Sequence, residues 1–106
     1  MIDQHILEVI TEFRAQILDN KPPHLMCYVV CSPLQALLEQ VYGLDCDLVE
    51  GRIDLPTEPL WGHYWIAHED QIIDPTASQF YDAHGQRVPE VYIGDLPDHY
   101  IELHRL

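Results

Sequence analysis

The stretch GHYWIAHEDQIID, residues 62–74, carries a histidine near its start and an aspartate at its end. A two-residue turn centred on His68 and Glu69 would place His63 directly opposite Asp74 on one face of a hairpin. Opposed side chains have Cβ atoms within about 5 Å of each other. A carboxylate at that distance fixes the tautomer and orientation of an imidazole and stabilises its protonated form. We therefore predict that His63 and Asp74 are the base and the orienting acid of a catalytic site.

Two cysteines precede the hairpin near the start of a predicted helix and are candidate nucleophiles, Cys27 and Cys31. A thiolate is favoured at a helix N-terminus and beside a histidinium, because both lower the thiol pKa. Ser32 and Pro33 are typical of a cap and a first helical residue, which favours Cys31. If the helix begins earlier, Cys27 takes the N-terminal position and Pro33 implies a kink or a break. Cys46 follows the helix and is expected to be an ordinary buried thiol.

Hydrophobic periodicity indicates the elements that must hold these residues. Apolar residues at three- and four-residue spacing predict one helix over residues 2–19, ended by the prolines of DNKPPH, and a second over 26–43. Alternating and β-branched segments predict strands at 46–53, 61–68, 71–74, 90–96 and 99–103. The remaining segments are predicted loops, 54–60 and 75–89, the second with a short helical turn. Helices followed by antiparallel strands predict an α+β fold with the helices packed on one sheet.

Composition limits the class of protein. A chain of 106 residues suits a single domain, residues 1–106, with one core. Its formal charge of −13 repels phosphate backbones and anionic lipids, so nucleic acids and membranes are poor partners. No apolar run reaches the roughly 18 residues of a membrane span, and the N-terminus lacks signal-peptide features. Three cysteines argue against a disulfide framework and predict a cytoplasmic protein with reduced thiols.

The segments MCYVVCSPLQALLEQVYGLDCDLVEG, HYW and IIDPTASQF, within residues 26–80, resemble the papain-like and transglutaminase-like cysteine enzymes. The likeness is greatest to small bacterial members with Cys, His and Asp in this order. The resemblance implies a cysteine that opens a helix, with the histidine and aspartate on adjacent strands of an antiparallel sheet. It implies Cys27 as nucleophile, His63 as general base and Asp74 as orienting acid, because the family spacing to a Leu-Leu pair fits Cys27. Cys31 then takes the place of a small residue buried one turn below.

The resemblance leaves several surrounding residues with weaker assignments. No glutamine precedes Cys27 at papain-like spacing, so its backbone N–H, alone or with another amide, is the expected oxyanion donor. His24 and Trp65 are candidate pocket residues for which core or surface roles are the alternative. Phe80 is expected to pack on the core, and Gln79 to hold a loop.

The leading hypothesis is a cysteine-dependent acyl-transfer enzyme or hydrolase that acts on an amide through a thioester. The expected substrate is a protein, a peptide or a small amide, and the protease, deamidase and transglutaminase reactions stay open. No cofactor or metal is expected, and the oligomeric state is not predicted. The alternative is a catalytically silent protein-binding module on the same scaffold. A metal site from Cys27, Cys31 and a histidine is a third reading, weakened because a C-x3-C pair without a second spaced pair is untypical of structural zinc.

Overall fold

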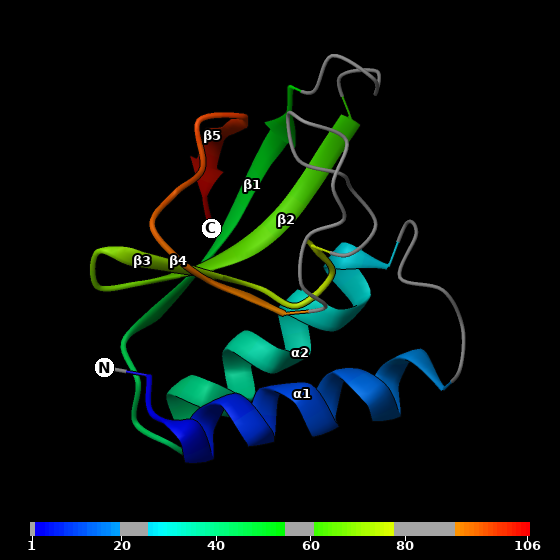
Figure 1. Ribbon diagram of the computed structural model, residues 1–106, viewed down its shortest axis with the longest axis vertical. Coiled ribbons are helices and arrows are strands. Elements are labelled where there is room, and N and C mark those ends of the chain that lie inside the picture. The colour runs from blue at the N-terminus through cyan, green and yellow to red at the C-terminus, as the bar shows by residue number, and fades with distance from the viewer. Residues whose placement is uncertain (1, 20–25, 55–60, 78–90) are drawn as a thin grey trace.

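The computed structural model describes residues 2–19, 26–54, 61–77 and 91–106. Within them, two helices are followed by five strands (Figure 1). The elements are α1 Gln4–Leu18, α2 Cys27–Gln40, β1 Cys46–Ile53, β2 Trp61–His68, β3 Gln71–Asp74, β4 Tyr92–Gly94 and β5 Tyr100–Arg105. The predicted α+β fold, with two helices packed on one antiparallel sheet, is confirmed.

Most of the predicted connections lie outside the described residues. These are residues 20–24 of the linker DNKPPH, residues 55–60 of the first predicted loop and residues 78–89 of the second. Three residues with proposed minor roles lie there as well, His24, Gln79 and Phe80.

Helix α1 begins and ends where its backbone groups find local partners. Asp3 caps the N-terminus by accepting a hydrogen bond from the backbone N–H of Ile6 at 2.9 Å. Asp19 ends the helix in the left-handed conformation with a φ of 47°, and its N–H donates to the carbonyl of Ala15. Among the described residues, no helix is long and apolar enough to cross a membrane.

Helix α2 contains a proline in its interior and still runs without a break. Pro33 lies within Cys27–Gln40, so the expectation of a helix that begins there with Ser32 as its cap is wrong. A proline at this position cannot donate to the carbonyl of Val29, one turn earlier. The Val29 side chain is half-exposed, so this turn of the helix faces solvent, where water can replace the missing donor.

The five strands form one antiparallel sheet in the order β4-β3-β2-β1-β5. Strands β1 and β2 pair along their whole length. Strands β2 and β3 pair only near their turn, from His68 opposite Gln71 to Ile66 opposite Ile73. Residues 61–65 of β2 therefore extend beyond the described pairing with β3.

The predicted register of the β2–β3 hairpin is wrong. A turn centred on His68 and Glu69 would pair Ala67 with Asp70, whereas Ala67 lies opposite Ile72. The turn consists instead of Glu69 and Asp70, and Glu69 adopts the left-handed conformation with a φ of 54°. The pairing is thus shifted by an even number of residues, which leaves every side chain on the face that was predicted.

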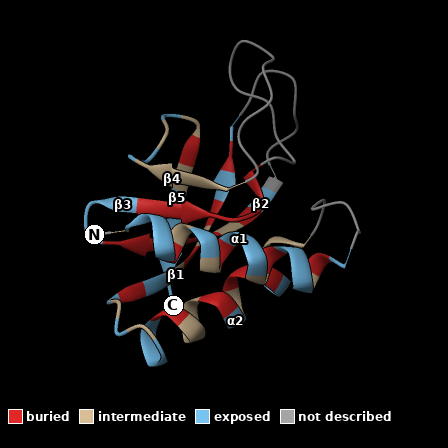
Figure 2. Ribbon diagram, turned by 60° about the horizontal axis from the view of Figure 1, so that its bottom comes forward, coloured by how far each residue is buried: buried red, intermediate tan, exposed pale blue. Residues whose placement is uncertain are grey.

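Alternation along the strands divides their side chains between two faces of the sheet. The face that packs against the helices, here called the helix face, contributes Cys46, Ile66 and Ile73 to a core with α1 and α2. Figure 2 shows the buried stripes that run along both helices. The opposite face carries a second cluster, made of Val49, Ile53, Trp65, Ala67, Ile72 and Tyr100. His63 and Asp74 belong to this opposite face, since they alternate with Tyr64 and Ile73.

The sheet curls around its opposite face. The hydroxyl of Tyr100, at the start of β5, donates a hydrogen bond to Asp74 at the end of β3, although β2 and β1 lie between these strands. Three strand spacings would separate them by about 14 Å in a flat sheet. The curl removes this separation, and the rings of Trp65 and Tyr100 pack edge-on in the concavity with centroids 5.1 Å apart.

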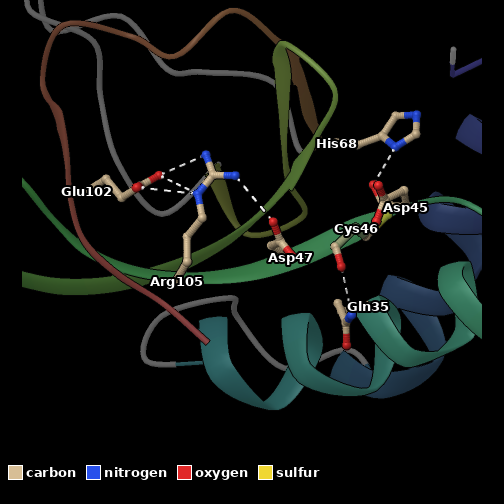
Figure 3. Close-up of polar contacts among 7 residues, drawn as sticks. All are labelled: Gln35, Asp45, Cys46, Asp47, His68, Glu102 and Arg105. Carbon is tan, nitrogen blue, oxygen red and sulfur yellow. Dashed lines mark hydrogen bonds and ion pairs between the residues drawn. The ribbon is translucent and has the colours of Figure 1, made fainter.

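Polar contacts tie the outer elements to β1 (Figure 3). The side-chain amide of Gln35 in α2 donates to the carbonyl of Cys46 at 2.9 Å. Arg105 in β5 donates to Asp47 of β1 and to Glu102 of its own strand. These contacts join α2 and β5 to β1, the strand that lies between β2 and β5 in the sheet.

We expect Gly51→Ala to destabilise the fold. A Cβ at Gly51 would overlap the ring of Trp65 and the backbone carbonyl of Ile101, and a backbone atom cannot move aside easily. The free energy of unfolding should fall by about 2–3 kcal/mol, the cost of overpacking a well-packed core. Denaturant unfolding measures this change. Gly62→Ala is the matched control, because an added Cβ there meets nothing within 4 Å. Equal effects of the two substitutions would contradict the close packing of Trp65 on β1.

Candidate active site

Cys27 lies at the first position of α2. The first helical hydrogen bond runs from the N–H of Val30 to the carbonyl of Met26, so the preceding N–H groups have no acceptor within the helix. The N-cap residue Met26 provides no side-chain acceptor either. These N–H groups and the helix dipole make this terminus favourable for a negative charge on the Cys27 sulfur.

One residue of β2 holds both cysteines of α2. The thiol of Cys31 donates to the backbone carbonyl of Tyr64 at 3.4 Å. The backbone of Tyr64 also lowers the pKa of the Cys27 thiol, an effect that must come from its N–H because only that group can donate. The N–H and carbonyl of one strand residue point to the same side of the strand. The first turn of α2 therefore lies along the edge of β2 at Tyr64, where β2 no longer pairs with β3.

The thiol of Cys27 is electrostatically activated. Its partial burial raises the pKa, but a hydrogen bond and the charge of His63, with backbone bonds from Tyr64 and Tyr28, outweigh burial and leave the pKa below 9.0. Burial likewise disfavours the His63 cation, yet the charge and hydrogen bond of Asp74, together with Cys27, raise the pKa of His63 to about 9. The two shifts act in the same direction, since a lowered thiol pKa and a raised imidazole pKa both favour a thiolate beside an imidazolium.

The other two cysteines have the opposite character. Cys31 is fully buried one turn below Cys27, and burial, followed by the charges of Asp74 and Cys27, raises its pKa well above 9.0. Burial and three nearby carboxylates raise the pKa of Cys46 to about 11. Cys31 is therefore a packing residue at the position where the resemblance implied a small side chain. All three cysteines are free thiols.

His63 and Asp74 meet as predicted, although through a different register. The Nε2 atom of His63 lies 2.7 Å from Oδ2 of Asp74, and both side chains are fully buried. If the observed register between β2 and β3 is continued, Asp74 comes opposite Trp65. His63 and Asp74 are therefore diagonal neighbours rather than directly opposed ones. Because Asp74 occupies Nε2, Nδ1 is the ring nitrogen left for Cys27.

Asp74 accepts hydrogen bonds on both of its carboxylate oxygens. Oδ1 accepts from the backbone N–H of Thr76 at 3.0 Å and from its hydroxyl at 3.4 Å. Oδ2 accepts from the Tyr100 hydroxyl at 2.5 Å in addition to His63. Sequence reasoning missed both partners. The Thr76 contact was detectable, because an aspartate commonly bonds the backbone two residues on, whereas no local signal connects Tyr100 to Asp74.

A buried arginine supports the segment that follows Asp74. The Nε–H of Arg14 in α1 donates to the carbonyl of Pro75 at 2.6 Å. Arg14 interrupts the apolar face of α1, and its side chain is largely buried. The bond joins the first helix to the turn that places Asp74 and Thr76, so all the layers of the fold contribute to the site.

Trp65, a candidate pocket residue, is fully buried in the cluster of the opposite face, with its ring 6.1 Å from that of His63. In the part of the chain that the structure describes, no group of three or more His, Cys, Asp or Glu side chains is arranged to hold a metal ion.

The chain matches no protein-family model, no curated protein and no solved structure.

We expect Cys27 to be the one cysteine that iodoacetamide alkylates rapidly in the folded protein. Its pKa is lowered, so the thiolate fraction should titrate with a midpoint below 9.0, and alkylation should persist as the pH falls toward neutrality. In His63→Ala the midpoint should move upward, because burial then acts without the histidine that opposes it. Mass spectrometry of peptides alkylated at a series of pH values gives both midpoints. An unchanged midpoint in His63→Ala would contradict the activation of Cys27 by His63.

Proposed function

We propose that this protein is a cysteine-dependent acyl-transfer enzyme or hydrolase that acts on an amide. The observation that supports this most directly is the buried hydrogen bond between His63 and Asp74, together with a thiol at a helix N-terminus whose pKa His63 lowers. A nucleophile, a base that contacts it and a group that orients the base are the parts that covalent acyl transfer requires.

In the proposed reaction, the thiolate of Cys27 attacks the carbonyl carbon of the substrate amide. The backbone N–H of Cys27, at the first position of α2, stabilises the resulting oxyanion. The C–N bond breaks as His63 transfers its proton to the leaving amine, and a thioester remains on Cys27. Neutral His63 then takes a proton from water or from an acceptor amine, whose attack on the thioester carbonyl releases the product and restores the Cys27 thiolate beside protonated His63. Asp74 orients His63 throughout.

We further propose that the scaffold is a papain-like or transglutaminase-like core. Support comes from the arrangement that the resemblance implies, namely a helix opened by Cys27 and neighbouring antiparallel strands that carry His63 and Asp74. The three free thiols agree with a reducing, cytoplasmic location, which is part of the same proposal. The acidic chain suits a neutral or basic peptide, a protein or a small amide as substrate.

The contact between Cys27 and His63 favours an enzyme over the alternative, a catalytically silent binding module. A module that only binds a partner gains nothing from a lowered thiol pKa or from a buried carboxylate behind the histidine. A buried histidine and carboxylate cost the fold desolvation energy that binding alone does not require.

Alanine substitutions at the three cysteines test the proposed nucleophile. Cys27→Ala should reduce turnover of a fluorogenic peptide-amide library by about 10⁴-fold or more, as removal of a covalent nucleophile does. Cys31→Ala and Cys46→Ala are matched controls that remove thiols without removing the proposed chemistry. Parallel assays with and without an added primary amine separate transfer from hydrolysis. Full turnover by folded Cys27→Ala would refute the proposed mechanism.

The rate should depend on pH with a maximum between the titrations of Cys27 and His63. Above a pH of about 9, His63 loses the proton that the leaving amine needs, so kcat/KM should fall. At acid pH, protonation of Cys27 removes the nucleophile, with a midpoint below 9.0. A steady-state pH profile measures both limbs. A rate that rises continuously through pH 10 would be inconsistent with His63 as the proton donor.

A further inference from the structure

The oxygen of Asp74 that holds His63 is shared with a second donor. Oδ2 lies 2.7 Å from Nε2 of His63 and 2.5 Å from the hydroxyl of Tyr100. Tyr100 comes from β5, which contributes no member of the proposed Cys-His-Asp set. The shared oxygen thus connects the last strand of the sheet to the histidine.

The surroundings of Tyr100 fix the position of its hydroxyl. Its side chain is buried, and its ring packs edge-on against His63 with centroids 5.9 Å apart and against Trp65 at 5.1 Å. The backbone N–H of Tyr100 donates to the carbonyl of Pro97, and the neighbouring carbonyl of His99 accepts from Asp54. Both the ring and the main chain are therefore restrained, which makes the hydroxyl a preorganised donor.

We propose that Tyr100 is a positioning residue of the active site, which fixes Oδ2 of Asp74 for His63 and moderates the hold of His63 on its proton. The inference rests on the proposed function, because it assigns a role within that catalytic site. It adds a residue from β5 that acts through Asp74 without touching the substrate.

The physical effect follows from sharing one oxygen between two donors. The hydroxyl withdraws negative charge from Oδ2, so the carboxylate stabilises the His63 cation less than an unshared oxygen would. Burial and the charge of Asp74 raise the pKa of Tyr100 well above its ordinary value, so the hydroxyl keeps its proton and stays a donor. Moderation of this kind matters for a general acid, since His63 must release its proton to the leaving amine.

The titratable and charged groups around this pair come from both helices and from β2, β3, β4 and β5. They are Arg14 of α1 on the Pro75 carbonyl, Cys27 and Cys31 of α2, His63 of β2, Asp74 of β3, Tyr92 of β4, Tyr100 of β5, and His99, whose ring packs edge-on against that of Tyr100. Of these, Tyr100 is the group whose hydrogen bond to Asp74 can be removed without changing a formal charge or a member of the proposed triad.

The test is the titration of His63 in Tyr100→Phe, followed by NMR of the imidazole nitrogens in the full chain. Loss of the hydroxyl should raise the pKa of His63 by about one unit, the equivalent of one hydrogen bond to a charged group. Thr76 still holds Oδ1, so the carboxylate remains in place. Tyr92→Phe is the matched control, because that hydroxyl bonds the carbonyl of Asp95 and no member of the triad.

A second variant keeps the test decisive if Tyr100→Phe does not fold. Site-specific 3-fluorotyrosine at position 100 keeps the ring and makes the hydroxyl a stronger donor, so the pKa of His63 should fall instead. An unchanged or oppositely shifted titration of His63 in either folded variant would overturn the proposal. The NMR readout needs no substrate. The two tests can therefore fail independently. Unimpaired turnover by Cys27→Ala would refute the proposed function, whereas the titration of His63 tests the role of Tyr100 alone.

Discussion

The buried carboxylate of Asp74 is the constraint on which the rest of the site depends. An ionised carboxylate without partners costs many kcal/mol inside a protein, so each of its oxygens must accept hydrogen bonds. The donors come from three places in the chain: the turn after β3 gives Thr76, β2 gives His63 and β5 gives Tyr100. Satisfying this one group requires the β3 turn to be held by Arg14 and the sheet to curl until β5 reaches β3.

The position of the thiol depends on a second feature, the early separation of β3 from β2. Because β3 pairs only with residues 66–68 of β2, the edge of Tyr64 is left for the first turn of α2. Cys31 donates to the carbonyl of Tyr64, and the backbone of Tyr64 lowers the pKa of Cys27, so both cysteines lie against one residue of β2. Cys31 anchors the helix, and this leaves Cys27 beside His63.

How far the sequence predicts this arrangement depends on whether the signal is local. Strands β1, β2 and β3 have the predicted bounds because alternation and turn residues mark them directly. The identity of the turn was wrong because the left-handed conformation at Glu69 is unusual for a non-glycine residue and has no strong sequence signal. The pairing of His63 with Asp74 survived this error, since a shift by two residues keeps the face of each side chain.

The contacts that sequence reasoning missed are those that depend on the curl of the sheet. Tyr100 reads as an ordinary strand residue, and Arg14 as a charged residue on a helix, because their partners lie in distant segments. The start of α2 is a related case: Ser32 and Pro33 have the local chemistry of a helix start, but α2 begins six residues before Pro33, at Cys27, where Cys31 bonds to Tyr64 of β2. Tertiary contacts here outweigh a local preference.

The cost of the buried polar site argues that it serves a function rather than stability. Apolar residues of similar volume in place of a buried charged pair are often neutral or stabilising. This fold nevertheless buries His63, Asp74 and Thr76 completely. His63 and Asp74 lie on the same sheet face as the apolar cluster that contains Trp65 and Tyr100. The same burial strengthens the interaction of His63 with Cys27, because fixed dipoles act more strongly where water is excluded. Exclusion of water from Asp74 therefore has two effects. It costs folding free energy, and it strengthens the electrostatic interactions through which Asp74 and His63 act on the Cys27 thiol.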